Sequence, residues 1–180
     1  MEAERGVVVR MPNHVGDAVM ALPALEAAAP DLVIVAHPLS SLVALATKAD
    51  IIPLGEGAAG FVRVVRRLRA ERPHRGLLFP ASFSSALVFA AGKVPERRGT
   101  ATDGRGRLLT DPIAPEALRR LHRSSGFWYV ATGEEPAEPP VPRLELPTDL
   151  AAQGRELIGE ARPSIGMVPG GAASSRRWDR

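Results

Sequence analysis

The sequence predicts an α/β fold, a doubly wound and mainly parallel sheet with helices on both faces. Over the first hundred residues, short runs of continuous apolar residues alternate with longer amphipathic or alanine-rich stretches. This alternation is typical of strands that are buried between two layers of helices. Hydrophobic residues make up 45% of the chain and charged residues 24%, as in ordinary globular proteins. The 180 residues suffice for one domain, or for one domain and the beginning of another.

The first strand, loop and helix stand near the N-terminus. Gly6–Met11 is rich in β-branched residues and predicts a strand, and the alanine-rich stretch Asp17–Ala29 predicts a helix. The loop between them contains proline, asparagine and glycine. The apolar run Leu32–Ala36 predicts the second strand, and Leu39–Lys48 predicts the next helix, with serines near its start.

The same alternation continues to residue 99. Ile51–Leu54 predicts a third strand, and Gly60–Glu71 predicts an amphipathic helix with its apolar side chains opposite its arginines. Gly76–Pro80 predicts a fourth strand, Ser82–Ala91 a helix, and Arg97–Gly99 a short edge strand. Ligands of such sheets bind outside the carboxyl ends of the strands. The loops after the first, fourth and fifth strands are therefore the places where a site is expected.

The remaining sequence predicts the end of one domain and the start of another. Thr100–Pro115 is polar and glycine-rich, Leu118–Ala131 predicts a helix, and Glu134–Pro147 is too rich in proline for regular structure. We interpret that last stretch as a linker. Residues 1–147 are accordingly expected to form an N-terminal domain with the linker at its end.

Residues 148–180 are expected to contain the beginning of a truncated second domain. Thr148–Ala161 predicts a linker helix with Thr148 as its N-cap, and Ser164–Val168 predicts a strand that opens the new domain.

Composition excludes several kinds of chemistry. The chain has no cysteine, so it has no disulfide, no thiolate metal site and no cysteine nucleophile. The net charge is +3 and arginine greatly outnumbers lysine, which we attribute to coding bias rather than to a nucleic-acid partner. No apolar run reaches the length of a membrane span, and acidic residues near the N-terminus do not fit a signal peptide. A cytoplasmic location is expected.

The loop after the first strand carries the candidate catalytic residue. Asp17 follows Gly16 at the expected N-terminus of the first helix. Local evidence alone favours a helix cap or first-turn acid, whereas a carboxylate at the ligand-facing edge of the sheet could also accept a proton from an acceptor hydroxyl. Gly16 would let the backbone approach a substrate. Asn13 and His14 are candidate ligand contacts in the same loop, although turn residues explain them as well.

Two further segments offer polar groups to a ligand. Ser82 and its neighbouring serines stand at a helix start, where capping explains one hydroxyl and sugar binding another. The segment 97–107 is dense in arginine and glycine. It could be a solvated loop, or its arginines could bind the phosphates or carboxylates of an acidic substrate. Its candidate acceptor contacts are Arg98, Thr102, Asp103 and Arg105.

The last glycine-rich loop suggests a diphosphate site. It follows the expected strand at Ser164–Val168 and combines small residues, hydroxyls and cations, which suits a diphosphate held by backbone N–H groups. The candidate donor-phosphate contacts are Gly170, Gly171, Ala172, Ser175 and Arg176. The chain has neither the spacing of a P-loop nor a G-x-G-x-x-G motif after the first strand. No metal or cofactor is expected.

Three blocks in the same order resemble the lipopolysaccharide heptosyltransferases, and most closely the heptosyltransferase II branch. They are Met11–Ala24, the segment from Arg98 to Thr110, and the loop that begins at Pro169. The sequence departs from the family pattern in four places: His14 stands where tryptophan is usual, Ala81 where asparagine is common, Arg176 where lysine is usual, and Asp179 where proline is usual.

The resemblance implies the N-terminal, Rossmann-like acceptor domain of a GT-B glycosyltransferase. It implies transfer of heptose from ADP-heptose to the inner core of lipopolysaccharide, with inversion and without a covalent intermediate. Asp17 matches the family's catalytic aspartate, and the acceptor would be a membrane lipid. The protein would then be cytoplasmic and could contact the cytoplasmic face of the inner membrane through Arg63, Arg66, Arg67, Arg69 and Arg72, although a solvated helix face explains these arginines better.

Family members are about twice as long, so the resemblance implies that this chain alone transfers little or no heptose. Two alternatives stay open. One is a non-catalytic glycan-binding or interaction domain, and the other is a GT-B enzyme that uses a different nucleotide sugar.

Overall fold

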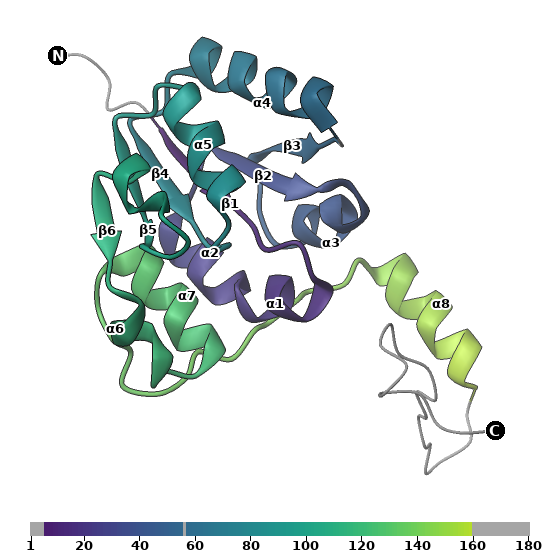
Figure 1. Cartoon of the computed structure of the whole chain (residues 1–180). Coiled ribbons are helices and arrows are strands. Elements are labelled where there is room, and N and C mark those ends of the chain that lie inside the picture. The colour runs from purple at the N-terminus through teal and green to yellow at the C-terminus, as the bar shows by residue number, and fades with distance from the viewer. Residues whose placement is uncertain (1–5, 56, 160–180) are drawn as a thin grey trace, which may run out of the picture. The chain divides into compact units, whose positions relative to one another are not determined.

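The computed structural model describes residues 6–55 and 57–159 (Figure 1). These residues separate into two compact units within the boundaries 1–145 and 146–180, and each unit is described by itself. The first unit holds a six-stranded sheet in which every neighbouring pair of strands is parallel. Its strands are β1 (Val7–Arg10), β2 (Leu32–Ala36), β3 (Asp50–Leu54), β4 (Arg75–Leu78), β5 (Glu96–Thr100) and β6 (Asp111–Ile113).

The order of the strands is β3-β2-β1-β4-β5-β6. This is the doubly wound Rossmann order. Strands β2 and β3 extend the sheet on one side of β1, and β4, β5 and β6 extend it on the other, so the order of strands reverses between β1 and β4. The predicted Rossmann-like α/β fold is confirmed. The helices of this unit are α1 (Val15–Met20), α2 (Leu22–Ala28), α3 (Ser40–Ala44), α4 (Gly57–Glu71), α5 (Phe83–Ala91), α6 (Pro115–Arg119) and α7 (Arg123–Thr132), with 3-10 turns η1 (His37–Leu39) and η2 (Arg105–Leu108).

Two hydrophobic clusters cover the two faces of the sheet. Helices α4 and α5 pack on one face through residues such as Val64, Leu68 and Phe89. Helices α1, α2, α3 and α7 pack on the other through residues such as Leu25 and Phe127. Figure 1 shows the two layers above and below the strands. Because successive side chains of a strand point to opposite faces, the apolar runs of the central strands serve both clusters.

Two predicted helices are each divided in the structure. Asp17–Ala29 becomes α1 and α2, which meet at Ala21. Pro23 lies at the start of α2, where its missing N–H prevents a continuous helix but suits a first turn. Leu118–Ala131 becomes α6 and α7, because His122 takes an extended conformation and its side chain caps α7 by accepting a bond from the Ser124 N–H.

The region after β4 departs further from the prediction. The segment Arg97–Gly99 lies in β5, which is an inner strand and not an edge, because β6 pairs with it on the outside. Strand β6 lies within the stretch expected to be a loop. Pro112 is acceptable there because an edge strand leaves one row of N–H groups unpaired.

The proline-rich stretch has no helix or strand up to Pro147. The second unit contains α8 (Thr148–Ile158), which is shorter than predicted and ends before Gly159 at a positive φ of 71°. Thr148 is not its N-cap. That position belongs to Pro147, and no side chain caps the helix. The predicted strand Ser164–Val168 lies outside the described residues. Among the described helices, none has the length and apolar character that crossing a bilayer requires.

Candidate functional site

The candidate site lies at the carboxyl edge of the sheet, where β1 and β4 are neighbours. Strand β1 pairs with β4 along its length, while the chain continues from β1 toward β2 and from β4 toward β5. The loops that follow β1 and β4 therefore diverge and leave a crevice between them, which is where sheets of this order bind ligands. Asp17 belongs to the segment after β1, and Ser82 belongs to the segment after β4.

Asp17 lies in the first turn of α1, and its carboxylate is bound by a residue that lies 106 positions later in the sequence. Both oxygens accept hydrogen bonds from Arg123, Oδ1 from Nε at 3.0 Å and Oδ2 from Nη2 at 3.1 Å. Arg123 is the first residue of α7, and its guanidinium also lies over the Phe127 ring at 5.0 Å. This two-point contact fixes the orientation of the carboxylate as well as its position.

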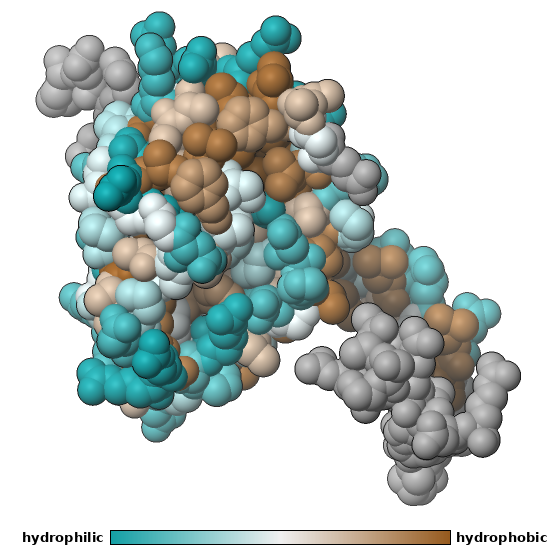
Figure 2. Space-filling model, in the orientation of Figure 1, coloured by the Kyte–Doolittle hydropathy of each residue, from teal (hydrophilic) through white to brown (hydrophobic). Residues whose placement is uncertain are grey.

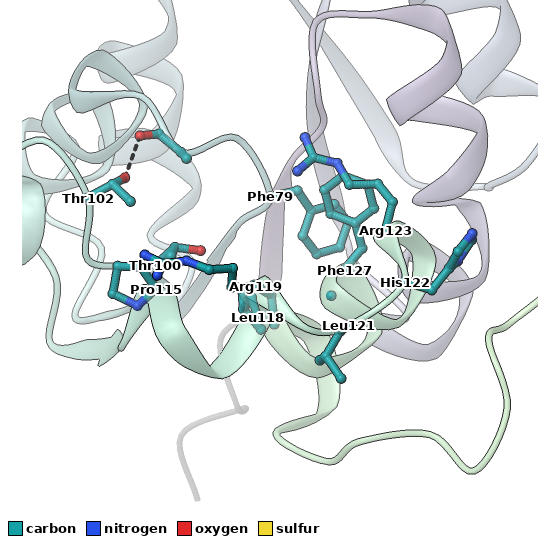
Figure 3. Close-up of a pocket in the computed structure, with 13 residues that line it drawn as sticks. Phe79, Thr100, Thr102, Pro115, Leu118, Arg119, Leu121, His122, Arg123 and Phe127 are labelled. Carbon is teal, nitrogen blue, oxygen red and sulfur yellow. Dashed lines mark hydrogen bonds between the residues drawn. The ribbon is translucent and has the colours of Figure 1, made fainter.

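A pocket of about 390 Å³ opens beside this ion pair, and we call it the Arg123 pocket. Figure 3 shows Phe79, Arg123 and Phe127 on one side of it and Thr100, Thr102 and Pro115 on the other. The walls are apolar near the two phenylalanine rings, which lie 5.5 Å apart between centroids. Its polar groups come from the threonines and arginines. The mixture of apolar walls and a few placed polar groups is typical of small-molecule sites.

Thr102, a predicted acceptor contact, lines this pocket. Its hydroxyl donates to the carbonyl oxygen of Ala81 at 2.9 Å, which ties the loop after β5 to the loop after β4 (Figure 3). The hydroxyl oxygen keeps lone pairs that could accept a bond from a ligand.

A second pocket of about 210 Å³ lies on the other side of the loop after β4, and we call it the Arg10 pocket. Arg10 is the last residue of β1 and only 4% exposed. Its guanidinium donates to the carbonyl oxygens of Met11 and Ile34 and to the amide oxygen of Asn13. Burial lowers the pKa of Arg10 to about 10, because water no longer solvates the charge.

Ser82 lines the Arg10 pocket and caps α5. Its hydroxyl accepts from the Ser85 N–H at 3.4 Å and lies 2.6 Å from the Ser85 hydroxyl. The capping expected from the sequence is therefore present, and Ser84 adds an exposed hydroxyl at the same helix start.

The predicted arginine contacts of the segment 97–107 lie inside the protein. Arg105 is completely buried, and its guanidinium donates to the carbonyl oxygens of Thr100, Pro80 and Ser82. Burial lowers the pKa of Arg105, and the nearby Asp103 carboxylate partly opposes that effect. Arg98 pairs with Asp111 and donates to the Val130 carbonyl oxygen.

These arginines hold loops together and present no free face to a ligand. Asp103 is exposed, at a positive φ of 49° in the turn before η2. Thr102 and the exposed Asp103 remain candidate acceptor contacts, whereas the guanidinium groups of Arg98 and Arg105 are already engaged within the domain.

The loop after β1 gathers the other predicted residues at the edge. Asn13, His14 and Gly16 are all exposed there. His14 occupies the N-cap position of α1 but its side chain makes no capping bond. A methyl group added at Gly16 would meet nothing within 4 Å, so the space above this residue is open to a ligand. Gly170, Gly171, Ala172, Ser175 and Arg176 lie outside the described residues.

Two residues of the site were missed by sequence reasoning. Arg123 had no local signal, because its partner lies 106 positions away. Arg10 could have been recognised from the sequence, because it is a charged residue at the end of an otherwise apolar strand, next to the candidate loop.

Comparison with known proteins identifies the fold. No protein-family model matches the chain, and no curated protein sequence matches it. Among solved structures, the chain is similar to E. coli ADP-heptose LPS heptosyltransferase II, with 19% identity and a TM-score of 0.67 over 87% of this chain and 51% of that one. It is also similar to a family 9 glycosyl transferase from Veillonella parvula, with 16% identity and a TM-score of 0.77 over 99% of this chain and 57% of that one.

The chain spans about half the length of both structures. At these identities the likeness establishes the fold, and the resemblance read from the sequence is confirmed at that level. The chain has the Rossmann-like α/β fold that about half of each of these two glycosyltransferase structures contains.

Proposed function

We propose that this chain is the acceptor-side half of an inverting glycosyltransferase that moves heptose from ADP-heptose to the inner core of lipopolysaccharide. The observation that carries the proposal is the Asp17 carboxylate, which Arg123 fixes at the carboxyl edge of the sheet beside the Arg123 pocket. The motif around Asp17 and the shared fold support the same conclusion.

In the proposed reaction, Asp17 acts as the general base. An acceptor hydroxyl attacks the anomeric carbon of the heptose while its proton passes to the Asp17 carboxylate. The new carbon–oxygen bond forms as the bond from the anomeric carbon to the diphosphate breaks, and ADP leaves with the electron pair. The configuration inverts because the attack occurs opposite to the leaving group. The proton then passes from Asp17 to water.

Arg123 is a positioning residue in this proposal. Its two hydrogen bonds fix the plane of the carboxylate, and each carboxylate oxygen keeps a lone pair that can accept the proton. Asn13, His14, Gly16, Ser82, Thr102 and Asp103 would contact the acceptor. Gly170, Gly171, Ala172, Ser175 and Arg176 would bind the donor diphosphate, with Arg176 stabilising the charge that develops on the departing ADP.

The decisive experiment follows heptose transfer by the gene product that contains this chain. The protein is incubated with ADP-heptose and with lipopolysaccharide whose inner core lacks the heptose, and mass spectrometry detects the addition of one heptose. Asp17→Asn should abolish transfer while leaving the melting temperature nearly unchanged. Full activity of Asp17→Asn, or transfer from UDP-sugars in preference to ADP-heptose, would overturn the proposal.

The isolated 180-residue chain is expected to bind the acceptor without transferring heptose, because the matched structures are about twice its length. Rate enhancement requires donor, acceptor and base in one site. Heptose transfer that depends on Asp17 in this chain alone would contradict this part of the proposal.

A cytoplasmic protein in peripheral contact with the inner membrane would meet a lipid-linked acceptor. Figure 2 shows apolar side chains gathered over α4 and α5, where Val62, Phe83 and Leu87 are exposed near the arginines of α4. Apolar and basic groups together are typical of surfaces that bind anionic membranes. Flotation with anionic vesicles but not with neutral vesicles, reduced by Val62→Ser, is the expected result, and equal recovery with both would contradict it.

A further inference from the structure

The Arg10 pocket contains a buried positive charge, and among the described residues no negative charge is paired with it. Arg10 is 4% exposed, and within residues 6–55 and 57–159 no carboxylate pairs with it. Its three hydrogen-bond acceptors, on Met11, Ile34 and Asn13, are neutral oxygens. Removing a charged group from water without a counter-ion is costly. A pocket beside such an unpaired charge is therefore suited to binding an anion.

The pocket around Arg10 is built for such a ligand. Its floor is apolar, with Ile34, Phe61 and Val88, which strengthens electrostatic attraction by excluding water. Its polar side chains are all able to donate: the Arg10 guanidinium, the Asn13 amide and the hydroxyls of Ser82, Ser84 and Ser85. No described residue that lines it is acidic.

The start of α5 adds to the attraction. This nine-residue helix begins at Phe83, and Ser82 at its N-cap lines the pocket. The first N–H groups of a helix have no partner within the helix, and the helix dipole makes this end positive. Arg10 and the start of α5 thus reach the pocket from β1 and from the loop after β4, the two sides of the crevice.

We propose that the Arg10 pocket binds an oxyanion, a carboxylate or a phosphate, that belongs to the acceptor glycan. Asn13 lines the pocket and precedes Asp17 by four positions, so an acceptor anchored here would lie close to the segment that carries the base. Assigning the anion to the acceptor rests on the proposed function, whereas the binding of an oxyanion does not. At about 210 Å³ the pocket suits one charged group and part of a sugar ring.

The test uses the 180-residue chain and inorganic phosphate as the probe. Phosphate is titrated at constant ionic strength, and the melting temperature and the NMR shifts of the backbone amides are followed. Ligand binding to the native state raises the melting temperature in a saturable way. We expect saturable binding with the largest amide shifts at Asn13 and at the start of α5. The absence of saturation, or shifts spread over the surface arginines, would overturn the proposal.

Ser84→Asp provides the first variant, since it places a carboxylate at the mouth of the pocket. It should raise the melting temperature without phosphate, because it supplies a counter-ion to Arg10, and it should abolish the phosphate response. Ser41→Asp is the matched control: Ser41 is exposed in the first turn of α3, a helix that packs on the opposite face of the sheet. It should leave the phosphate response unchanged. A normal response in Ser84→Asp would contradict the proposal.

Glu56→Gln tests whether the chain supplies its own anion, since Glu56 lies in the sequence between two glycines that line the pocket and is outside the described residues. Wild type and Glu56→Gln should bind phosphate equally. Binding that occurs in Glu56→Gln but not in wild type would overturn the proposal.

The source of the anion is distinguished by comparing glucuronate with glucose 6-phosphate. Tighter binding of glucuronate assigns the pocket to a sugar carboxylate, and tighter binding of glucose 6-phosphate assigns it to a sugar phosphate. In the transfer assay, Ser84→Asp should raise the KM for the acceptor by at least tenfold and leave the KM for ADP-heptose unchanged. Phosphate binding with an unchanged acceptor KM would refute the acceptor assignment alone, and loss of Asp17 dependence would refute the proposed function alone.

Discussion

The Arg123 guanidinium holds both carboxylate oxygens of Asp17, with contacts of 3.0 and 3.1 Å. The contact joins the segment after β1 to the first residue of α7. Its position is supported by the packing of α7, whose Phe127 belongs to the same hydrophobic cluster as Leu25 of α2. The orientation of the proposed base therefore depends on how a distant helix docks.

Arg123→Ala should lower kcat for heptose transfer by about 100-fold, because misplacing a reacting group by a small distance has an effect of that size. The KM for ADP-heptose should stay within about twofold, since Arg123 does not contact the donor in the proposed reaction. Arg123→Lys should have a kcat between those of wild type and Arg123→Ala, because lysine keeps the charge but cannot form two parallel bonds. Steady-state kinetics with both substrates provides the measurement.

Measurements of folding stability distinguish the proposed positioning role of Arg123 from a purely structural one. The two side chains are 60% and 29% exposed, so their ion pair should contribute only about 0.2–1 kcal/mol to folding. Arg120→Ala, at an exposed residue three positions earlier, serves as the control and should leave kcat unchanged. If Arg123→Ala lowers kcat and also greatly lowers the free energy of unfolding, the result would count against a positioning role.

Gly16→Ala should increase stability and decrease transfer. The added methyl group meets nothing within 4 Å in the chain, and replacing glycine inside a helix stabilises it by about 0.5–1 kcal/mol. If the acceptor approaches the backbone here, the same methyl group obstructs it and raises the acceptor KM. Urea unfolding and acceptor titration provide the two measurements. An increase in stability with unchanged kinetics would remove Gly16 from the proposed site.

Arg105→Ala should destabilise the domain by about 2 kcal/mol or more, because it removes the hydrogen bonds to the carbonyl oxygens of Thr100, Pro80 and Ser82 and leaves a cavity where a fully buried side chain stood. Arg107→Ala is the matched control, since Arg107 lies in the same 3-10 turn but is exposed. Its unfolding free energy should change by less than about 0.5 kcal/mol. Equal effects of the two substitutions in urea unfolding would show that the buried contacts do not stabilise the loops.

Much of the fold could be predicted from the sequence because central parallel strands are buried on both faces and so appear as continuous apolar runs, as in Leu32–Ala36. Strand β6, which was not predicted, has no such apolar run in the sequence. It is three residues long, contains Pro112, and forms because β5 offers it an open edge. The division between α6 and α7 was also hidden, since His122 is not among the usual capping residues.

The site was predictable only where its residues are close in sequence. Asn13 and His14 lie in the loop after β1, Gly16 and Asp17 lie in the first turn of α1, and the motif that they form placed them together. The roles of the arginines were not predictable, because composition does not tell a solvent-facing guanidinium from a buried one. The Nε and Nη1 atoms of Arg105 donate to carbonyl oxygens at the end of β5 and in the segment after β4, and that arrangement exists only after folding.

Arg10 makes the stability of the domain depend on pH in a defined direction. Burial lowers its pKa from the ordinary arginine value to about 10 in the folded protein, so the unfolded state binds the proton more tightly. Below pH 10 the folded state carries the full cost of the buried charge, which corresponds to about 3 kcal/mol. As pH rises above 10, the folded state releases the proton before the unfolded state does, and this cost diminishes.

Arg10→Met should therefore be more stable than wild type by about 1–3 kcal/mol at pH 8 in phosphate-free buffer, because an apolar side chain of similar length removes the buried charge. The Ile34 carbonyl oxygen keeps a donor in the Met11 N–H at 2.9 Å. The advantage should shrink above pH 10, and millimolar phosphate should reverse it by stabilising wild type. Urea unfolding of both proteins from pH 8 to 11 gives the difference. A less stable variant with a pH-independent difference would show that the carbonyl contacts already compensate the charge of Arg10.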